Sequence, residues 1–320
     1  MRQVLRISIK GGLRVHNSIK ILAALCVMQT ALVFIVWFKP QDTQQDAGSL
    51  IKVNLEKIAY AKIIDNERAV TLRSGNENWS ESVTVDSNYL GDQKKISGFI
   101  SQILKLKPQW ALTQTIEAVK RFELSESNFQ RKVELYNKND ELLETLFTGT
   151  SPEFGKVHAR ISKNNYVFAV DLANHELSTD ADDWIDKEQL AAKNLPIKVH
   201  INHTEGTEDL RLVQIAESVW EVNGKLADEQ KVNYYLSHYE NLRILGISNP
   251  VEEGQGKVGS INFTDDENEI IFQFYKSVND EFSITKSTQN GTYRVAEHRV
   301  NQLLIDDSDL LVTEQDLDSP

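Results

Sequence analysis

The stretch Val133–Phe147, VELYNKNDELLETLF, decides the fold. Its two ends, Val133–Tyr136 and Leu142–Phe147, are strand-like runs, and the asparagines and aspartate between them are typical of a tight turn. This arrangement predicts a β-hairpin. A second stretch, Ser260–Tyr275 (SINFTDDENEIIFQFY), has the same organisation. The sequence therefore indicates a fold built from one unit that occurs twice.

Both hairpins lie within a longer pattern that repeats in the same order. Two strand-like runs come first, followed by a tryptophan, a helical stretch with apolar residues at spacings of three and four, and two hairpins. The order β-β-Trp-α-β-β-β-β predicts an α+β fold, in which two repeated domains each combine a mainly antiparallel sheet with a helix. The expected segments of the first copy are Ile58–Ile64, Ala69–Arg73, a helix capped by Asp92 that contains Ile96–Leu104, Val133–Tyr136, Leu142–Phe147, Val157–Ile161 and Tyr166–Val170. Those of the second copy are Ile197–Ile201, Leu210–Ile215, the helix Asp228–Tyr239, Ser260–Thr264, Ile270–Tyr275, Phe282–Lys286 and Tyr293–Val295.

Four residues mark structural motifs. Trp79 and Trp220 occupy matching places in the two copies, and each can stack on a ligand or fill the core where the helix crosses the sheet. The core role is favoured, because a large ring stabilises most when buried. Trp184 and Asp186 belong to the segment 178–187, STDADDWIDK, where serine and threonine followed by acids indicate a helix start. A calcium loop is the alternative, but the glycine and terminal glutamate of an EF-hand loop are missing.

Several short motifs resemble the domain of unknown function 4340 family. The strongest is DDWIDKEQL at Asp182–Leu190, which is similar to that family's acidic-Trp-x-Asp-Lys-x-x-Leu element. The resemblance covers residues 50–312 as two copies. It implies a single-pass envelope protein with an accessory role, often encoded beside ABC transporter subunits of the gliding-motility-associated type, and it supplies no catalytic residues. The other matching motifs are Gly75 with Trp79, Ile103–Leu106, Phe122–Ser127, Gly149 and Leu245–Pro250.

An apolar run precedes the repeats. Ile21–Phe38, ILAALCVMQTALVFIVWF, is long enough to span about 27 Å as a helix, which predicts a transmembrane anchor. A cleaved signal peptide is disfavoured by the length of the run and its bulky end, and a buried core helix by its lack of a polar face. Five cations and no acid precede it, which predicts a cytoplasmic N-terminus. Together with the family resemblance, this implies that the chain is anchored in a bacterial inner membrane with its bulk in the periplasm. Gln29 and Thr30, at mid-bilayer, either contact a partner helix or face lipid.

The expected organisation has six parts. Residues 1–20 are a basic cytoplasmic leader, 21–38 the transmembrane helix, 39–50 a linker, 51–192 and 193–312 the two α+β repeats, and 313–320 an acidic tail. The formal charge is −12 overall and +5 over residues 1–38, which leaves −17 for residues 39–320. Such a body repels phosphates, so no nucleic acid partner is expected. The one cysteine, Cys26, lies in the apolar run and excludes an intrachain disulfide.

No pattern indicates catalysis, and we expect neither enzyme activity nor a cofactor. Gly254–Gly259 (GQGKVG) fits G-x-G-x-x-G, but a turn precedes it and a strand follows, which is the wrong context for a dinucleotide site. A Walker A sequence is absent, so nucleotide binding is not expected. His200 and His203 are three apart on an expected strand and point to opposite faces, which disfavours a metal site.

Three functions are compatible with these observations. The first is a non-catalytic accessory subunit of an envelope ABC transporter complex, which docks on a permease or another inner-membrane envelope protein. The alternative is a periplasmic ligand-sensing or binding module that uses a groove between the two repeats and needs an exposed aromatic patch. The third, a hydrolase with dispersed carboxylates, needs a cleft with converging acids of shifted pKa.

Overall fold

The computed structural model describes residues 21–22, 24–30, 48–75, 78–86, 89–108, 111–204, 208–250, 256–265 and 268–312. The chain divides into two units, residues 1–48 and 49–320. In the first unit the described residues between 21 and 30 are helical and exposed, Gln29 and Thr30 among them. The Thr30 hydroxyl donates to the Cys26 carbonyl at 2.8 Å. No described helix is long and apolar enough to cross a membrane. The leader, the rest of the predicted span and the acidic tail lie outside the described residues.

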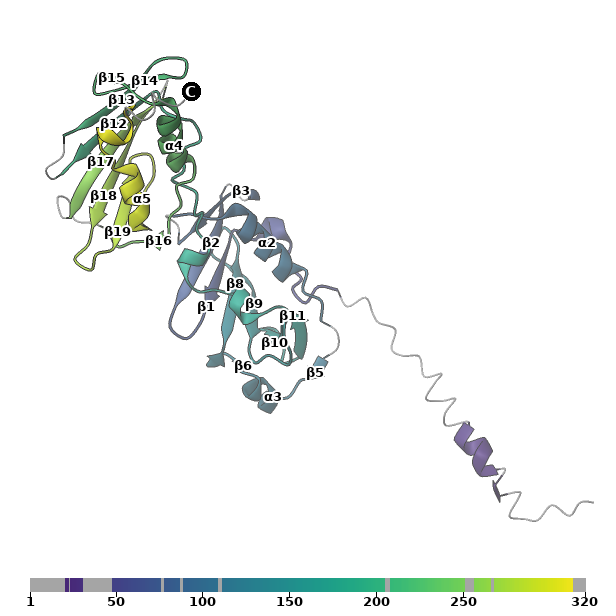
Figure 1. Cartoon of the computed structure of the whole chain (residues 1–320). Helices are drawn as coiled ribbons and strands as arrows, with labels where there is room; N and C mark the ends of the chain where they lie inside the picture. Colours follow the sequence, from purple (N-terminus) through teal and green to yellow (C-terminus); the bar gives the residue numbers. More distant parts are fainter. Residues whose placement is uncertain are drawn as a thin grey trace, which may run out of the picture. The chain divides into compact units, whose positions relative to one another are not determined.

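The second unit contains two large, mainly antiparallel sheets, which confirms the mixed α/β prediction (Figure 1). Within the described residues each has nine strands, in the orders β4-β3-β2-β1-β8-β9-β10-β11-β5 and β15-β14-β13-β12-β17-β18-β19-β20-β16. The first sheet comprises β1 (Tyr60–Ile64), β2 (Ala69–Gly75), β3 (Asn78–Val85), β4 (Tyr89–Leu90), β5 (Ala111–Thr113), β8 (Arg131–Tyr136), β9 (Leu142–Thr148), β10 (Lys156–Ile161) and β11 (Val167–Asp171). The second comprises β12 (Lys198–His203), β13 (Leu210–Ala216), β14 (Val219–Val222), β15 (Lys225–Leu226), β16 (Gly246–Ile247), β17 (Lys257–Thr264), β18 (Glu269–Lys276), β19 (Phe282–Lys286) and β20 (Tyr293–Val295).

The two orders match strand for strand, from β4 and β15 at one edge to β5 and β16 at the other. A 12-residue helix follows the fourth strand in each case, α2 (Gln93–Leu104) and α4 (Glu229–Glu240). Asp92 and Asp228 cap these helices, accepting from the backbone N–H three residues on at 2.9 and 3.0 Å. We call residues 49–186 the first repeat and residues 198–312 the second.

Each helix buries an apolar stripe against its own sheet. Ile96, Ile100 and Ile103 of α2 are fully buried, and α4 buries Val232 and Leu236 in the same manner. In Figure 1, α2 lies along one face of the first sheet, and α4 with α5 (Glu297–Leu303) along one face of the second. The period of three and four in the sequence therefore corresponds to the buried side of each helix.

Each repeat closes by the same contact. After its last strands the chain returns to the start of the helix, where Gly91 bridges Ile185 and, in the second repeat, Ala227 bridges Leu311. The N–H groups of the cap residues donate to the carbonyls of Trp184 and Leu310, both at 2.8 Å. A short 3-10 turn precedes each bridge, Ala181–Asp183 in the first repeat and Asp307–Asp309 in the second. Two further 3-10 turns, Leu55–Lys57 and Asn174–Glu176, lie in the first repeat.

The sequence-based pattern missed part of each repeat. The tryptophans lie within third strands, β3 and β14, rather than in a connection to the helix, and the short edge strands were not predicted. The helix expected within 178–187 is wrong in extent, because only the 3-10 turn Ala181–Asp183 forms before the bridge at Ile185.

The first repeat also carries an insertion between β5 and β8. It consists of α3 (Ile116–Arg121) and the hairpin β6 (Leu124–Ser125) and β7 (Asn128–Phe129). Phe147 of β9 is buried with Val119 of α3 in a second small apolar cluster. On the matching strand β18, Gln273 lies between the buried Phe272 and Phe274 and is half-buried. The insertion therefore covers Phe147 in the first repeat, and among the described residues no such elements lie between β16 and β17 in the second.

Candidate site at the junction of the two repeats

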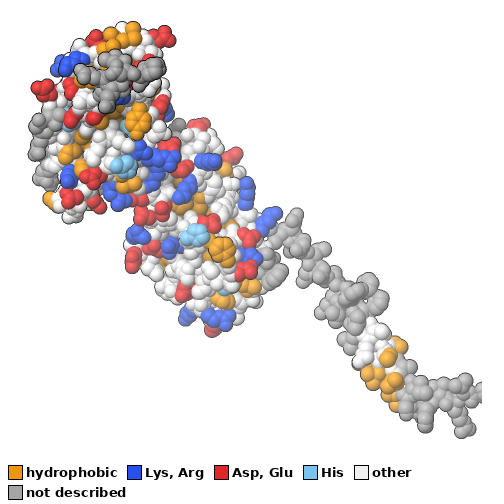
Figure 2. Space-filling model, in the orientation of Figure 1, with side chains coloured by type: hydrophobic (Ala, Val, Ile, Leu, Met, Phe, Trp, Pro, Cys, Tyr) orange, Lys and Arg blue, Asp and Glu red, His pale blue; other side chains and the backbone are white. Residues whose placement is uncertain are grey.

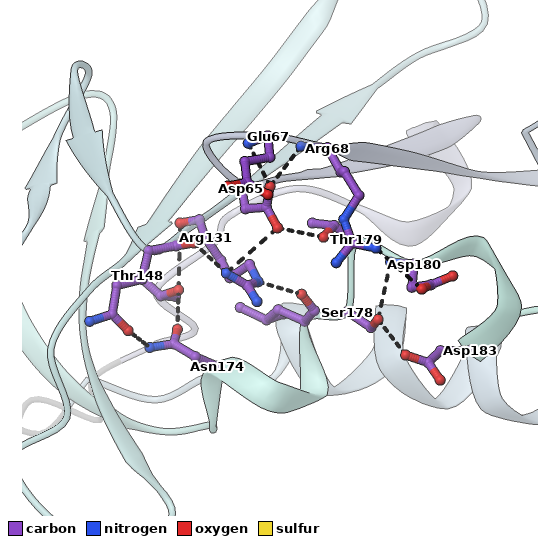
Figure 3. A network of polar contacts seen from close by, with 12 residues as sticks. Asp65, Glu67, Arg68, Arg131, Thr148, Asn174, Ser178, Thr179, Asp180 and Asp183 are labelled. Atoms are coloured by element: carbon purple, nitrogen blue, oxygen red, sulfur yellow. Dashed lines mark hydrogen bonds and ion pairs between the residues drawn. The ribbon is translucent and has the colours of Figure 1, made fainter.

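A network of polar contacts fixes the start of the connector, which we define as residues 178–192, to the first sheet (Figure 3). Asp65, in the turn between β1 and β2, accepts hydrogen bonds from the Thr179 hydroxyl at 2.6 Å and from the N–H groups of Glu67 and Arg68 at 2.8 and 2.7 Å. Burial alone raises the pKa of Asp65, but these donors and the nearby Arg131 outweigh it and lower the pKa to about 2. The carboxylate is therefore ionised and fully engaged by the chain itself.

The remaining contacts of the network extend along the same segment. Arg131 donates from Nε to the Leu177 carbonyl at 2.9 Å, and the Thr148 hydroxyl donates to Asn174 at 2.6 Å. Ser178 donates to the Asp183 carboxylate at 2.5 Å. Donors and acceptors here pair with each other, which is typical of a structural network rather than of an exposed reactive group.

Trp184 and Asp186 hold the connector at the start of α2. The Trp184 side chain is 1 % exposed, its indole N–H donates to the Ser178 carbonyl at 2.9 Å, and its ring lies 5.0 Å from that of Phe99. The N–H of Asp186 donates to the Leu90 carbonyl at 2.9 Å, and its carboxylate accepts from the Glu188 N–H. Both residues therefore stabilise the contact between the end of the first repeat and the start of α2.

The same connector binds the second sheet at its β16 edge. One oxygen of Asp182 accepts from the Ile247 N–H at 2.6 Å, and the other pairs with the Arg294 guanidinium. Lys187 donates from Nζ to the Leu245 carbonyl at 2.6 Å. Burial lowers the pKa of Lys187, although the neighbouring acids oppose this shift. Connector side chains thus bond to the Ile247 N–H of β16 and to the Leu245 carbonyl just before this strand.

Further along, the connector packs on β19 and β20. Gln189 accepts from the Tyr293 hydroxyl at 3.0 Å, and the Gln289 amide donates to the Gln189 carbonyl at 2.9 Å. Burial raises the pKa of Tyr293 to about 12, with Tyr89 of the first repeat contributing. The Tyr89 and Tyr293 rings meet edge to face at 5.9 Å. The two repeats are therefore joined by polar and aromatic contacts as well as by the chain.

A groove of about 540 Å³ lies beside this connector. Its lining comes from β3 and the start of α2 in the first repeat, from connector residues Asp186–Glu188, and from Arg243 after α4. The lining contains both charge signs, with Glu81 and Asp92 among the acids and Lys94 and Lys187 among the cations. Arg243 pairs with Glu188. Figure 2 likewise shows acidic and basic side chains interspersed over the visible face. A polar, open lining differs from the enclosed apolar pockets that bind most small molecules.

The tryptophans are buried in the core. Trp79 is 3 % exposed and donates to the Ile58 carbonyl at 2.9 Å, and Trp220 is 5 % exposed. With Trp184 also buried, these three provide no exposed aromatic patch for stacking on a ligand. Trp110 lies outside the described residues.

The histidine pair has separate partners. His200 lies 3.6 Å from Asp209, whereas His203 lies 3.3 Å from the Ile305 carbonyl. Across the described ranges no three His, Cys, Asp or Glu residues are grouped as metal ligands would be. The glycine motif lies partly outside the described residues, and β17 begins at Lys257 inside it.

Ile247 and Arg294 were not predicted from the sequence as partners of Asp182, nor was Tyr293 as a partner of Gln189. These pairs are 65, 112 and 104 residues apart along the chain, so their identities carry no local signal. The acids of the connector were interpreted as caps. Asp180 does cap a turn, accepting from the Asp182 N–H at 3.0 Å, but Asp182 itself acts across the junction.

Comparison with family models matches the Domain of unknown function (DUF4340) over residues 79–257, more than half of the chain. The chain belongs to the DUF4340 family. In this DUF4340 protein the matched segment runs from β3 to the start of β17, so it contains both capped helices and the whole connector. No curated protein and no solved structure matches the chain.

Proposed function

We propose that this DUF4340 protein is a non-catalytic accessory subunit of an envelope ABC transporter complex, anchored by residues 21–38 in the inner membrane, with its two repeats in the periplasm as a scaffold or docking domain. The observation that carries the proposal is the connector, which is bonded to both sheets. A body whose two halves are fixed to each other presents surfaces at set positions, which is what a docking scaffold requires.

The charge and the apolar run support this assignment. The acidic body disfavours anionic lipid and nucleic acid as partners and is compatible with a protein partner. The basic leader before the apolar run fits a cytoplasmic N-terminus. The polar side chains of Gln29 and Thr30 are the places within the run where a partner helix can form hydrogen bonds.

Affinity purification of the full chain from gently solubilised membranes tests the proposal. We expect an ABC permease or another inner-membrane protein to co-purify at a fixed ratio after crosslinking in cells. A double variant, Gln29→Leu with Thr30→Val, reports on the helix contact, and Ala24→Leu is its matched control within the same run. Recovery of the chain alone, with and without crosslinking, would contradict the proposal.

The groove at the junction favours a second candidate, a periplasmic ligand-binding module. Its volume of about 540 Å³ and its lining from both repeats are the supporting observations. Thermal unfolding of the full chain in detergent with a soluble N-acetylglucosamine oligosaccharide, and separately with a short extended peptide, tests it. A saturable rise in melting temperature that Arg243→Glu removes supports the module; an unchanged melting temperature at millimolar concentrations counts against it.

A further inference from the structure

The edge strand of the second sheet is covered by an acidic segment. β16 is the last strand in the order, and Asp182 and Lys187 satisfy the Ile247 N–H and the Leu245 carbonyl on its outer side. An edge strand left unpaired is a template for another chain. In this molecule the acidic end of the first repeat removes that hazard.

At the matching edge of the first sheet, none of the described residues provides such a cover. β5 is the last strand there and pairs with β11 alone, through Thr113 with Val167 and Ala111 with Phe168. Leu112 is 44 % exposed, and Ile116 and Tyr166 beside it are 60 % and 44 % exposed. Among the described residues no side chain bonds to the outer side of β5 as Asp182 does to β16. The two repeats therefore differ at this edge: the connector bonds to β16 in the second repeat, whereas β5 in the first repeat remains exposed.

The sequence segment that contains β5 carries a net positive charge, whereas the whole chain is negative. Between residues 105 and 121, which contain β5 and α3, there are four cations and one acid, Glu117, whereas the chain carries −12. All four cations are exposed. They are Lys105, Lys107, Lys120 and Arg121. An exposed strand edge flanked by exposed apolar side chains and cations is complementary to an extended acidic segment. At β16 the acidic connector bonds to the edge through its side chains, and its residues Ala181–Asp183 form a 3-10 turn.

We infer that the β5 edge docks an extended acidic segment of a partner protein by strand addition. This rests on the proposed docking function and names the surface that performs it. Backbone hydrogen bonds to β5 supply the pairing, the exposed side chains of Leu112, Ile116 and Tyr166 are available for apolar contact, and the cations select acidic side chains.

A labelled peptide with the sequence of residues 178–187, STDADDWIDK, is the probe. Its fluorescence anisotropy with the full chain in detergent measures binding, and the same peptide with its acids replaced by amides is the control. We expect saturable binding that weakens at least tenfold in the double variant Lys107→Glu with Lys120→Glu. Leu112→Pro, which removes a backbone donor on an edge strand, is expected to weaken it likewise. Lys57→Glu with Lys225→Glu, exposed lysines elsewhere, is the matched control and leaves affinity unchanged.

Four kinds of result overturn the inference. Equal affinity for the amide peptide, or binding unchanged in Lys107→Glu with Lys120→Glu, removes the charge argument. Binding that is lost in Arg294→Ala and kept in Leu112→Pro places the peptide on β16 instead. Concentration-dependent self-association, measured by light scattering and abolished by the charge reversal, assigns the edge to a second copy of the chain. A permease that co-purifies equally with the charge-reversed variant leaves the scaffold function intact and rejects only the β5 edge.

Discussion

Asp182 in the connector and Arg294 on β20 form an ion pair across the junction of the two repeats. The same carboxylate accepts the Ile247 N–H, so one side chain joins the end of the first repeat to two elements of the second. Loss of this carboxylate leaves a guanidinium and an edge N–H without their partner.

We expect Asp182→Ala to lower the free energy of unfolding by about 2 kcal/mol, because the change removes both the hydrogen bond that a charged carboxylate accepts from the Ile247 N–H and the ion pair with the partly exposed Arg294. Urea unfolding measures the loss, and amide hydrogen exchange is expected to accelerate at residues 244–248. Glu217→Ala, at an exposed acid, is the control. Unchanged exchange at 244–248 in Asp182→Ala would show that the pair does not hold the junction.

The Asp65 network predicts a dependence on pH. Its folded pKa of about 2 lies below the ordinary 3.8, so the carboxylate stabilises the fold above pH 3.8 and loses that contribution as the pH falls from 3.8 to about 2. We expect Asp65→Asn to lower the free energy of unfolding by about 2 kcal/mol at pH 7 and by progressively less as the pH approaches 2. Glu67→Gln, in the same turn, is the control. A difference between wild type and Asp65→Asn that stays constant with pH contradicts the assignment.

Trp184 fills the space between the connector and α2. Trp184→Ala is expected to cost about 4 kcal/mol, because removal of a buried indole leaves a cavity and an unpaired Ser178 carbonyl. Trp184→Phe loses the donor but retains more of the buried volume than alanine does, so a smaller loss is expected. Calorimetry of both variants measures the difference. Equal melting temperatures for the alanine variant and wild type are incompatible with the packing described.

Asp92 and Asp228 offer a matched comparison between the repeats. Alanine at either position removes the acceptor for one helical N–H, and we expect each change to cost about 1 kcal/mol. Asn at either position retains an acceptor and is expected to recover most of the loss. Unfolding by urea checks both pairs, and a loss in the Asn variants as large as in the Ala variants argues against capping.

The parts of the fold predicted from sequence are those with a local signal. Ile96, Ile100 and Ile103 recur at helical spacing and α2 forms there, and the turn at residues 137–140 joins β8 and β9 as expected. Strands of two or three residues, such as β4 and β16, have no periodicity of their own and exist only through the neighbours they pair with.

The contacts at the junction of the two repeats could not be predicted from short stretches of sequence for a related reason. Asp182 and Ile247 are 65 residues apart, and Asp182 and Arg294 are 112 apart. An acid in a serine- and aspartate-rich stretch predicts a cap, and Asp180 fulfils that role. Which of several adjacent acids reaches across to another repeat depends on how the two sheets are placed, and a single sequence does not encode this in any short-range pattern.

The closing bridge at Gly91 and Ile185 has a mechanical consequence. The segment that closes the first repeat is followed within two residues by Lys187, which holds the edge of the second. A pulling force between the repeats therefore acts on residues 182–187 from both directions at once. When such a force is applied, we expect the contacts of residues 182–187 to break before the strands of either sheet separate.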